Sequence, residues 1–183
     1  MKLELWHAFV LGAILSWGVY VPVLHEGQST LAGDVKTRSL RAFLCVGLAY
    51  FITAVLVPVG LMLYRGQAFE WTSRGVTFAT LGGIAGAAGA LCIILSIASL
   101  PDPESVIYVA PLVFAGAPIV NVIVSLLWKT RQAPGPLFFV GIVLAALGAG
   151  IVLYSKNVLD AEQKRAKQAA AASAAPVVAQ VRN

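Results

Sequence analysis

Five long apolar runs alternate with short polar stretches along the chain. The runs cover residues 5–24, 40–64, 75–100, 105–128 and 136–154. A helix that crosses a bilayer needs about 20 mainly apolar residues, in a range of about 17–25. The last run is the shortest, and it still spans about 28 Å at about 1.5 Å per residue. The pattern predicts an all-α fold, a polytopic membrane helix bundle of five transmembrane helices.

The polar stretches predict where these helices end. Residues 25–39 predict a solvated loop, since they carry charged side chains at Glu26, Asp34, Lys36 and Arg38. Residues 101–104 (Pro-Asp-Pro-Glu) predict a tight turn, because proline cannot continue one helix but suits the first turn of the next. Residues 129–135 form a short basic turn. Residues 156–183 are a charged, Ala-rich tail that we expect to be partly disordered, with an interfacial helix near residues 160–172.

Composition supports the membrane interpretation. Hydrophobic residues make up 59% of the 183 positions, charged residues 11%, and the mean hydropathy is +0.85. Soluble domains have about 45–50% apolar and about 25% charged residues. A globule of this size cannot bury the excess, so we expect the lipid bilayer as the partner of the apolar surface. We predict one five-helix domain over residues 1–155 in a multi-pass protein of the cell inner membrane.

The net charge of +5 does not indicate a nucleic-acid partner. The basic residues lie between and after the apolar runs, where they orient a membrane protein, and they form no basic stripe interleaved with aromatic residues. With five helices the two ends lie on opposite sides. Five Lys and Arg residues then fall on the N-terminal side and eight on the C-terminal side, which predicts a cytoplasmic tail.

No catalytic or metal-binding pattern is visible in the sequence. It contains no Gly-rich phosphate loop, no His, Cys and carboxylate cluster at ligand spacing, and no nucleophile paired with a base. The two cysteines, Cys45 and Cys92, lie inside apolar runs without paired or metal-type spacing. We therefore predict no enzyme activity, no catalytic residue, no cofactor and no metal.

A few polar positions inside the runs are candidates for a solute path, although no ionisable residue lies at the centre of a run. In the fourth run one helical face carries Glu104, Tyr108, Pro111, Ala115, Pro118, Asn121 and Ser125. This face indicates either a water-accessible centre or a mildly polar helix interface. In the first run, Ser16, Trp17 and Tyr20 lie within two turns, and they line a path or pack in a core.

Small residues form a stripe on two of the predicted helices. The stripes consist of Gly82, Gly86 and Gly89 in the third run and of Gly141, Ala145 and Gly148 in the fifth. Helices in lipid associate through close packing of small residues, because apolar area has no advantage over lipid tails. We interpret both stripes as helix-packing surfaces; the other interpretation is that these glycines admit a substrate.

Several of these motifs occur together in a known family. The pair Trp17-Gly18 lies late in the first helix, a tight turn precedes a fourth helix with Pro111, and Gly141 and Gly148 lie in a closing helix before the tail. In this order they resemble one five-helix repeat of the drug/metabolite transporter superfamily, EamA-like branch, over about residues 5–155. Full-length members usually hold two inverted repeats, so this chain resembles a half-size member.

The resemblance implies a bundle that moves a small-molecule solute by alternating access. Because one repeat is present, it implies a dimer, either a homodimer or a pair with a separate partner half. The substrate-path residues that it implies are Trp17, Tyr20, Ser96, Tyr108, Pro111 and Asn121. The alternative function is a non-transporting membrane subunit or scaffold.

Overall fold

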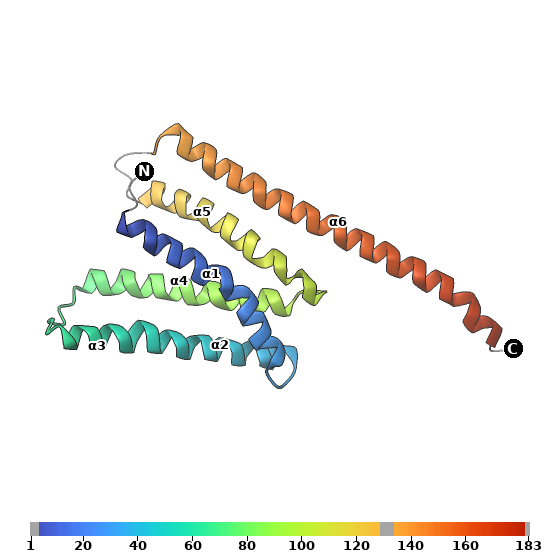
Figure 1. Ribbon diagram of the computed structural model, residues 1–183, viewed down its shortest axis with the longest axis horizontal. Coiled ribbons are helices and arrows are strands. Elements are labelled where there is room, and N and C mark those ends of the chain that lie inside the picture. The colour runs from blue at the N-terminus through green and yellow to red at the C-terminus, as the bar shows by residue number, and fades with distance from the viewer. Residues whose placement is uncertain (1–3, 129–133, 182–183) are drawn as a thin grey trace. The chain divides into compact units, whose positions relative to one another are not determined.

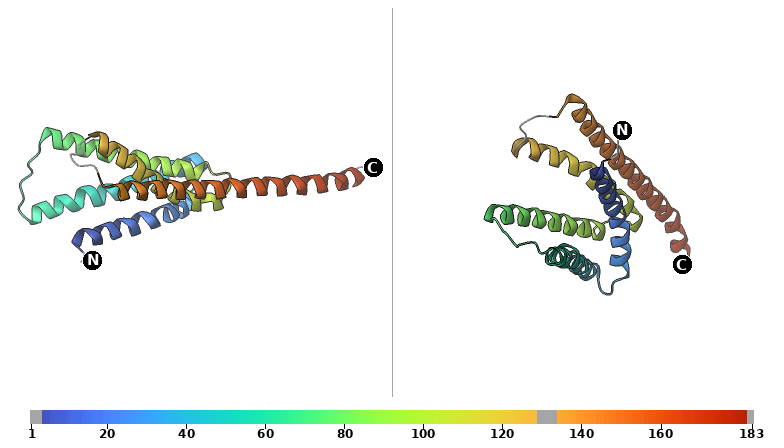
Figure 2. Two further views of the ribbon diagram at one scale, coloured as in Figure 1. Left: turned by 90° about the horizontal axis from the view of Figure 1, so that it is seen from above. Right: turned by 60° about the vertical axis from the view of Figure 1, so that its left-hand side comes forward.

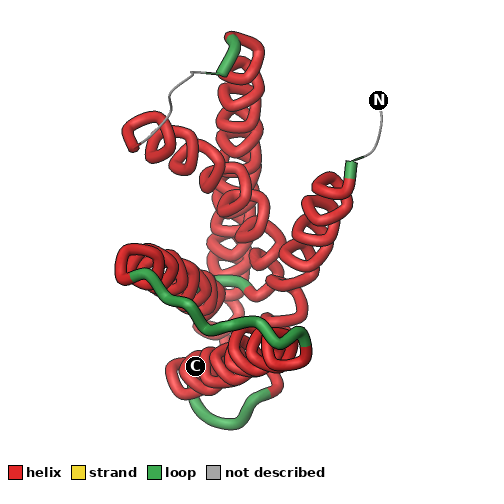
Figure 3. Tube along the Cα trace, turned by 90° about the vertical axis from the view of Figure 1, so that its left-hand side faces the viewer, coloured by secondary structure: helices red, strands yellow, loops and turns green. Residues whose placement is uncertain are grey.

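The computed structural model describes residues 4–128 and 134–181, with side chains up to residue 170. In these ranges the chain forms helices and loops and no strand (Figure 3). The helices are α1 (Leu5–Thr30), α2 (Val35–Phe51), the π-helix η1 (Ile52–Leu56), α3 (Val57–Tyr64), α4 (Ser73–Ala98), the 3-10 helix η2 (Pro103–Tyr108), α5 (Val109–Trp128) and α6 (Pro136–Val181).

Five stretches of helix are long and apolar enough to cross a membrane. They are Leu5–Thr30, Val35–Tyr64, Ser73–Ala98, Pro103–Trp128 and Pro136–Ala170. The all-α prediction and the five candidate spans are therefore confirmed for the described residues. Of the predicted basic turn at residues 129–135, residues 129–133 lie outside them.

The chain divides into two compact units, Met1–Val109 and Ala110–Asn183. The first contains α1, α2, η1, α3, α4 and η2, and the second contains α5 after its first residue together with α6. That residues 1–155 form one five-helix domain stays a prediction.

In the first unit, α2 packs along α4, α3 continues the line of α2 after η1, and α1 crosses α2 and α4 near its own C-terminal end (Figures 1 and 2). The core of this unit lies at that crossing. Its buried apolar side chains are Val21, Leu24, Ala42, Ala90, Ile93, Ile94, Ile97 and Val109. By contrast, no side chain between Leu5 and Val19 on α1 is buried.

Helix α1 is longer than its apolar run, and the predicted loop over residues 25–39 is wrong at both ends. The helix continues to Thr30, and α2 begins at Val35, so the loop is four residues long. Glu and Gln are good helix formers. The hydroxyls of Ser29 and Thr30 donate to the carbonyl of Glu26 at 2.9 and 3.0 Å. The chain reverses at Gly33, whose φ of 108° is a left-handed conformation that suits glycine.

The second span is interrupted by one π-helical turn. Pro58 has no N–H, and its ring clashes with the carbonyl four residues earlier, that of Ala54. The π-turn over Ile52–Leu56 accommodates this by one wider bond, from the N–H of Val57 to the carbonyl of Ile52. The span therefore stays helical from Val35 to Tyr64.

In the second unit, α6 is one uninterrupted helix from Pro136 to Val181. The end of the fifth apolar run at residue 154 is thus not a helix end. Lys, Gln, Glu and Ala after that point are good helix formers, and Lys156 pairs with Asp160 one turn later. The expected partial disorder of the tail stays a prediction. None of the described side chains from residue 110 to residue 170 is buried.

Candidate functional site

Three helices of the first unit meet at a buried amide. Gln28 of α1 is only 6% exposed, and its Nε2 donates to Ser39 Oγ of α2 at 2.8 Å and to the carbonyl of Ile94 of α4 at 3.3 Å. Ser39 is 1% exposed, and its hydroxyl in turn donates to the carbonyl of Val35 at 2.7 Å. A polar network therefore links α1, α2 and α4 inside a mostly apolar core.

The network leaves one acceptor of the amide without a partner. Exchanging the amide oxygen and nitrogen would point an oxygen at the Ile94 carbonyl, so the hydrogen bonds determine the orientation of Gln28. In that orientation Gln28 Oε1 is buried and accepts no hydrogen bond from the described residues. An unpaired buried polar group costs about 1–3 kcal/mol, and native structures keep few of them.

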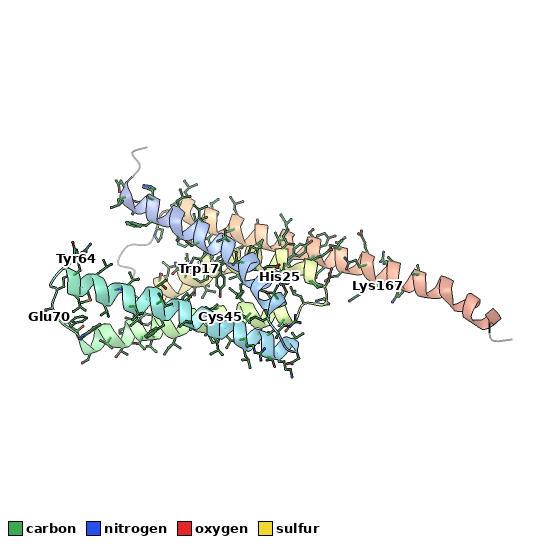
Figure 4. The ribbon with its side chains drawn as sticks, turned by 60° about the horizontal axis from the view of Figure 1, so that its bottom comes forward. Trp17, His25, Cys45, Tyr64, Glu70 and Lys167 are labelled. Atoms are coloured by element: carbon green, nitrogen blue, oxygen red, sulfur yellow. The ribbon has the colours of Figure 1, made fainter. Side chains whose placement is uncertain are left out.

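A groove opens beside this network between α1 and α2. Its volume is about 570 Å³, and its lining includes Ser16, Tyr20, Gly27, Gln28, Ala42 and Cys45. All of its lining residues belong to residues 16–31 and 42–49, and most of them are apolar. Figure 4 marks the two helices that form its walls, with Trp17 and His25 on α1 and Cys45 on α2.

Tyr20 is a second residue of the groove that has an unpaired oxygen. Its ring lies against the indole of Trp17, one turn earlier on α1, with the ring centroids 5.4 Å apart and tilted by 57°. The Tyr20 hydroxyl is buried and has no hydrogen-bond partner among the described residues. Tyr20 and Gln28 are thus two residues of the same groove with a buried oxygen that lacks a partner.

A smaller pocket of about 200 Å³, which also includes Gln28 in its lining, lies between the end of α1, the start of α2 and the residues around the end of α4. It is lined by His25, Gln28, Ser29 and Arg38, among others. The Arg38 guanidinium donates through Nη1 to the carbonyl of Ser29 at 3.0 Å, so it caps the last turn of α1. A second nitrogen of this group, Arg38 Nε, is buried without a described partner.

In the short loop between α1 and α2, the Thr37 hydroxyl beside Asp34 lowers the pKa of that carboxyl below its ordinary value. Asp34 directly precedes the first turn of α2, where a negative charge is favourable.

The structure brings together only part of the predicted substrate path. Trp17 and Tyr20 are in contact, and Tyr20 lines the groove. Ser96 is exposed on α4 and Tyr108 ends η2, and neither lines the groove. Pro111 and Asn121 belong to the second unit, where both are exposed. The role of these six residues stays a prediction.

The two small-residue stripes are open in the structure. A Cβ atom added at Gly82, Gly86 or Gly89, or at Gly141 or Gly148, would meet no atom within 4 Å beyond its own stretch of helix. Ala145 is half-buried. The described contacts therefore do not use these glycines for close helix packing, and the packing role stays a prediction.

The sequence interpretation missed Gln28 and Ser39 because both residues fell in the predicted loop. One signal was present: Gln28 follows Val21 and Leu24 at steps of three and four, which places it on the same helical face as those apolar residues. Comparison of the chain with protein-family models, with curated proteins and with solved structures found no match.

Proposed function

We propose that this chain crosses the inner membrane five times and is a half-size EamA-like transporter. In this proposal two chains together move a small metabolite by alternating access, along a path that includes the six residues that the resemblance implies. The observation that carries the proposal is the groove between α1 and α2, where Tyr20 and Gln28 each have a buried oxygen without a partner.

Membrane insertion is supported by the exposure of large apolar side chains along the helices. Leu5 is 74% exposed, Leu44 72% and Leu137 81%. Soluble monomers rarely expose contiguous apolar patches larger than a few hundred Å². In lipid the same surface costs nothing, and the backbone groups of the helices are already paired within each span. Resistance of the protein to extraction by alkaline carbonate tests this part of the proposal.

Transport is supported by polar groups that stability does not require. An amide oxygen or a phenol without a hydrogen-bond partner lowers the stability of a helix bundle in lipid, because burying it in an apolar medium costs free energy. In membrane proteins, polar groups kept at such positions mark substrate paths. Gln28 and Tyr20 satisfy this description, and both lie on α1, one of the helices that the EamA-like resemblance places along the path.

A dimer is part of the proposal because a single repeat lacks the second half of an inverted-repeat transporter. The open glycine stripe on α4 and the uncovered first half of α1 are surfaces on which a second chain can pack. An odd number of spans with a weak charge bias is what a chain that inserts in both orientations would have. An antiparallel homodimer would then supply the missing half by symmetry; a parallel dimer and a separate partner half are the alternatives.

The antiparallel dimer can be tested with two variants, each of which is forced into one orientation in the membrane. One variant carries three added lysines in the tail after residue 156, and the other carries three in the loop between Tyr64 and Ser73. The antiparallel model expects each variant to be inactive alone and active when both are expressed together. Activity of either variant alone contradicts that model.

Uptake into liposomes tests transport itself. The purified protein is reconstituted and screened with labelled sugars, amino acids and nucleosides, and protein-free liposomes give the background. For a solute that enters, Tyr20→Phe removes only the phenol oxygen and is expected to reduce uptake. The matched control is Tyr64→Phe, because Tyr64 is 88% exposed at the end of α3, away from the groove (Figure 4).

The rival function is a non-transporting membrane subunit or scaffold. It is favoured by one observation: no Asp, Glu, Lys or Arg lies in the central part of any of the five apolar runs, whereas many transporters carry such a charge. This function expects no uptake of any solute in liposomes, together with stable co-purification of another membrane protein.

A further inference from the structure

The pocket of about 200 Å³ at the turn between α1 and α2 is lined by both polar and apolar side chains. The end of α1 and the start of α2 contribute the polar ones, which are His25, Gln28, Ser29 and Arg38. The apolar ones are Val35 and, around the end of α4, Ile97, Ala98 and Pro103. We infer that this pocket binds the singly charged phosphodiester headgroup of an anionic lipid.

Arg38 brings to the pocket a positive charge that no described residue neutralises. The ion pair that the described residues form is between Lys156 and Asp160, and none of the residues that line the pocket is acidic. A guanidinium has five N–H groups. Among the described residues only the Ser29 carbonyl accepts from Arg38, through Nη1 at 3.0 Å. Because Nε is buried, the terminal nitrogens are the donors that a ligand reaches.

The hydrogen bond to Ser29 holds the guanidinium beside a second residue of the lining. A planar guanidinium matches the spacing of two phosphate oxygens, and hydrogen bonds between such charged groups are stronger than those between neutral groups. The imidazole of His25, which is half-buried in the same lining, offers a further N–H to the ligand. These groups favour an oxyanion as the occupant.

The surroundings of the pocket favour an anion with a single negative charge. Acidic residues adjoin the lining along the chain, namely Glu26, Asp34, Asp102 and Glu104. Their charges oppose the binding of inorganic phosphate or a phosphate monoester, which carries about −1.5 to −2 at pH 7. A phosphodiester carries one negative charge, which Arg38 matches. The apolar part of the lining suits the glycerol backbone and the first acyl carbons of a lipid.

The lengths of the helices place the pocket at the level of lipid headgroups. Helices α1 and α4 have 26 residues each, which is about 39 Å at about 1.5 Å per residue. The hydrocarbon core of a bilayer is about 30 Å thick, and the bilayer with its headgroups is about 40–45 Å thick. The C-terminal ends of both helices, which border the pocket, therefore reach the headgroup layer. This step rests on the membrane insertion in the proposed function and is independent of transport.

Native mass spectrometry of the full chain in detergent micelles measures lipid binding at this pocket. The dissociation constant of the first bound lipid is determined for phosphatidylglycerol, zwitterionic phosphatidylcholine and uncharged diacylglycerol with identical acyl chains. Arg38→Gln removes the charge from the pocket. The matched control is Arg41→Gln, because Arg41 also donates through Nη1 to a carbonyl of the same turn, that of Ala32, but does not line the pocket.

We expect the wild-type chain to bind phosphatidylglycerol more tightly than the other two lipids. Arg38→Gln should weaken this binding about tenfold, which is the effect of one charge-assisted hydrogen bond, and Arg41→Gln should change it by less than about twofold. Ala98→Leu fills the pocket without changing its charge, so it should also weaken the binding and keeps the test valid if Arg38→Gln does not fold. Ala79→Leu, at an exposed position toward the other end of α4, should not.

Several results would overturn the inference. Equal weakening by Arg38→Gln and Arg41→Gln would show a diffuse attraction to the basic turn, and equal binding of phosphatidylglycerol and diacylglycerol would show contact with acyl chains only. Displacement of phosphatidylglycerol by inorganic phosphate would make the pocket a site for a free anion. Protein that resists carbonate extraction but does not prefer phosphatidylglycerol contradicts only this inference, whereas extraction by carbonate contradicts the proposed membrane insertion.

Discussion

Replacing Gln28 with leucine separates the contribution of the buried amide to stability from its contribution to function. The substitution removes two hydrogen bonds, to Ser39 Oγ and to the Ile94 carbonyl, each with a net value of about 1 kcal/mol. It also removes the unpaired Oε1, which costs the native protein about 1–3 kcal/mol. Leucine fills a similar volume, so no large cavity remains.

The former partners of Gln28 stay satisfied in this variant. The Ser39 hydroxyl still donates to the Val35 carbonyl at 2.7 Å. The Ile94 carbonyl lies within α4 and keeps the helical N–H four residues later. We therefore expect the free energy of unfolding of Gln28→Leu to stay within about 1 kcal/mol of the wild-type value. The proposed transport path beside Gln28 predicts that solute uptake by this variant falls strongly.

Equilibrium unfolding in mixed detergent micelles, followed by circular dichroism, measures the first quantity. Ile94→Ala is the reference for a packing defect, because Ile94 is fully buried, and about 2–5 kcal/mol is the usual cost of such a truncation. A loss of more than about 2 kcal/mol in Gln28→Leu would refute the reasoning, since the amide would then be a structural link between the three helices.

Three further predictions concern Asp34, the tail and the fourth span. Protonation of Asp34 should destabilise the fold: its folded-state pKa is lowered, so its contribution is present above the ordinary value of 3.8 and is lost as the pH falls through the folded-state pKa. Asp34→Asn should flatten the melting temperature against pH in that acidic range. Reporter fusions to the tail should be active in the cytoplasm, and activity only in the periplasm would contradict the charge bias. In a chain with both native cysteines replaced, water-soluble thiol reagents should label cysteines at Tyr108, Ala115 and Asn121 but not at Val109, Val113 and Val120; equal inertness at all six would make this face of the fourth span a packing surface.

The apolar pattern predicts the number and type of the helices because lipid-spanning length is a property of composition. The third run, residues 75–100, and α4, Ser73–Ala98, differ by only two residues at each end. The first run differs more, since α1 continues six residues past residue 24. Hydropathy detects where the apolar character ends, but a helix ends only where its backbone hydrogen bonds are broken. In α1 that break is at Leu31–Asp34.

The candidate site was less predictable, for a related reason. The spacing of Trp17 and Tyr20 on α1 predicts their proximity, and their ring contact confirms it. Gln28 was hidden because a polar residue next to His25 and Glu26 resembles the start of a loop. Its burial depends on where α1 crosses α2 and α4, which is a long-range property that no local pattern contains. The π-turn before Pro58 is an intermediate case, because proline predicts a disturbance but not its form.

The distribution of burial along α1 determines which part of this helix is fixed and which part is free to meet a partner. Its buried residues, Val21, Leu24 and Gln28, all lie in the second half, and Gln28 holds this half to α2 and α4. Pro22 lies in this second half, directly after Val21, and it has no N–H to donate to the carbonyl of Gly18, so the helix is weakest there. Tyr20, which lines the groove, lies within one turn of Pro22, and the ring of Trp17 contacts Tyr20 from one turn earlier. The packing of the described residues therefore holds α1 through Val21, Leu24 and Gln28, whereas the side chains from Leu5 to Val19 remain available to a partner.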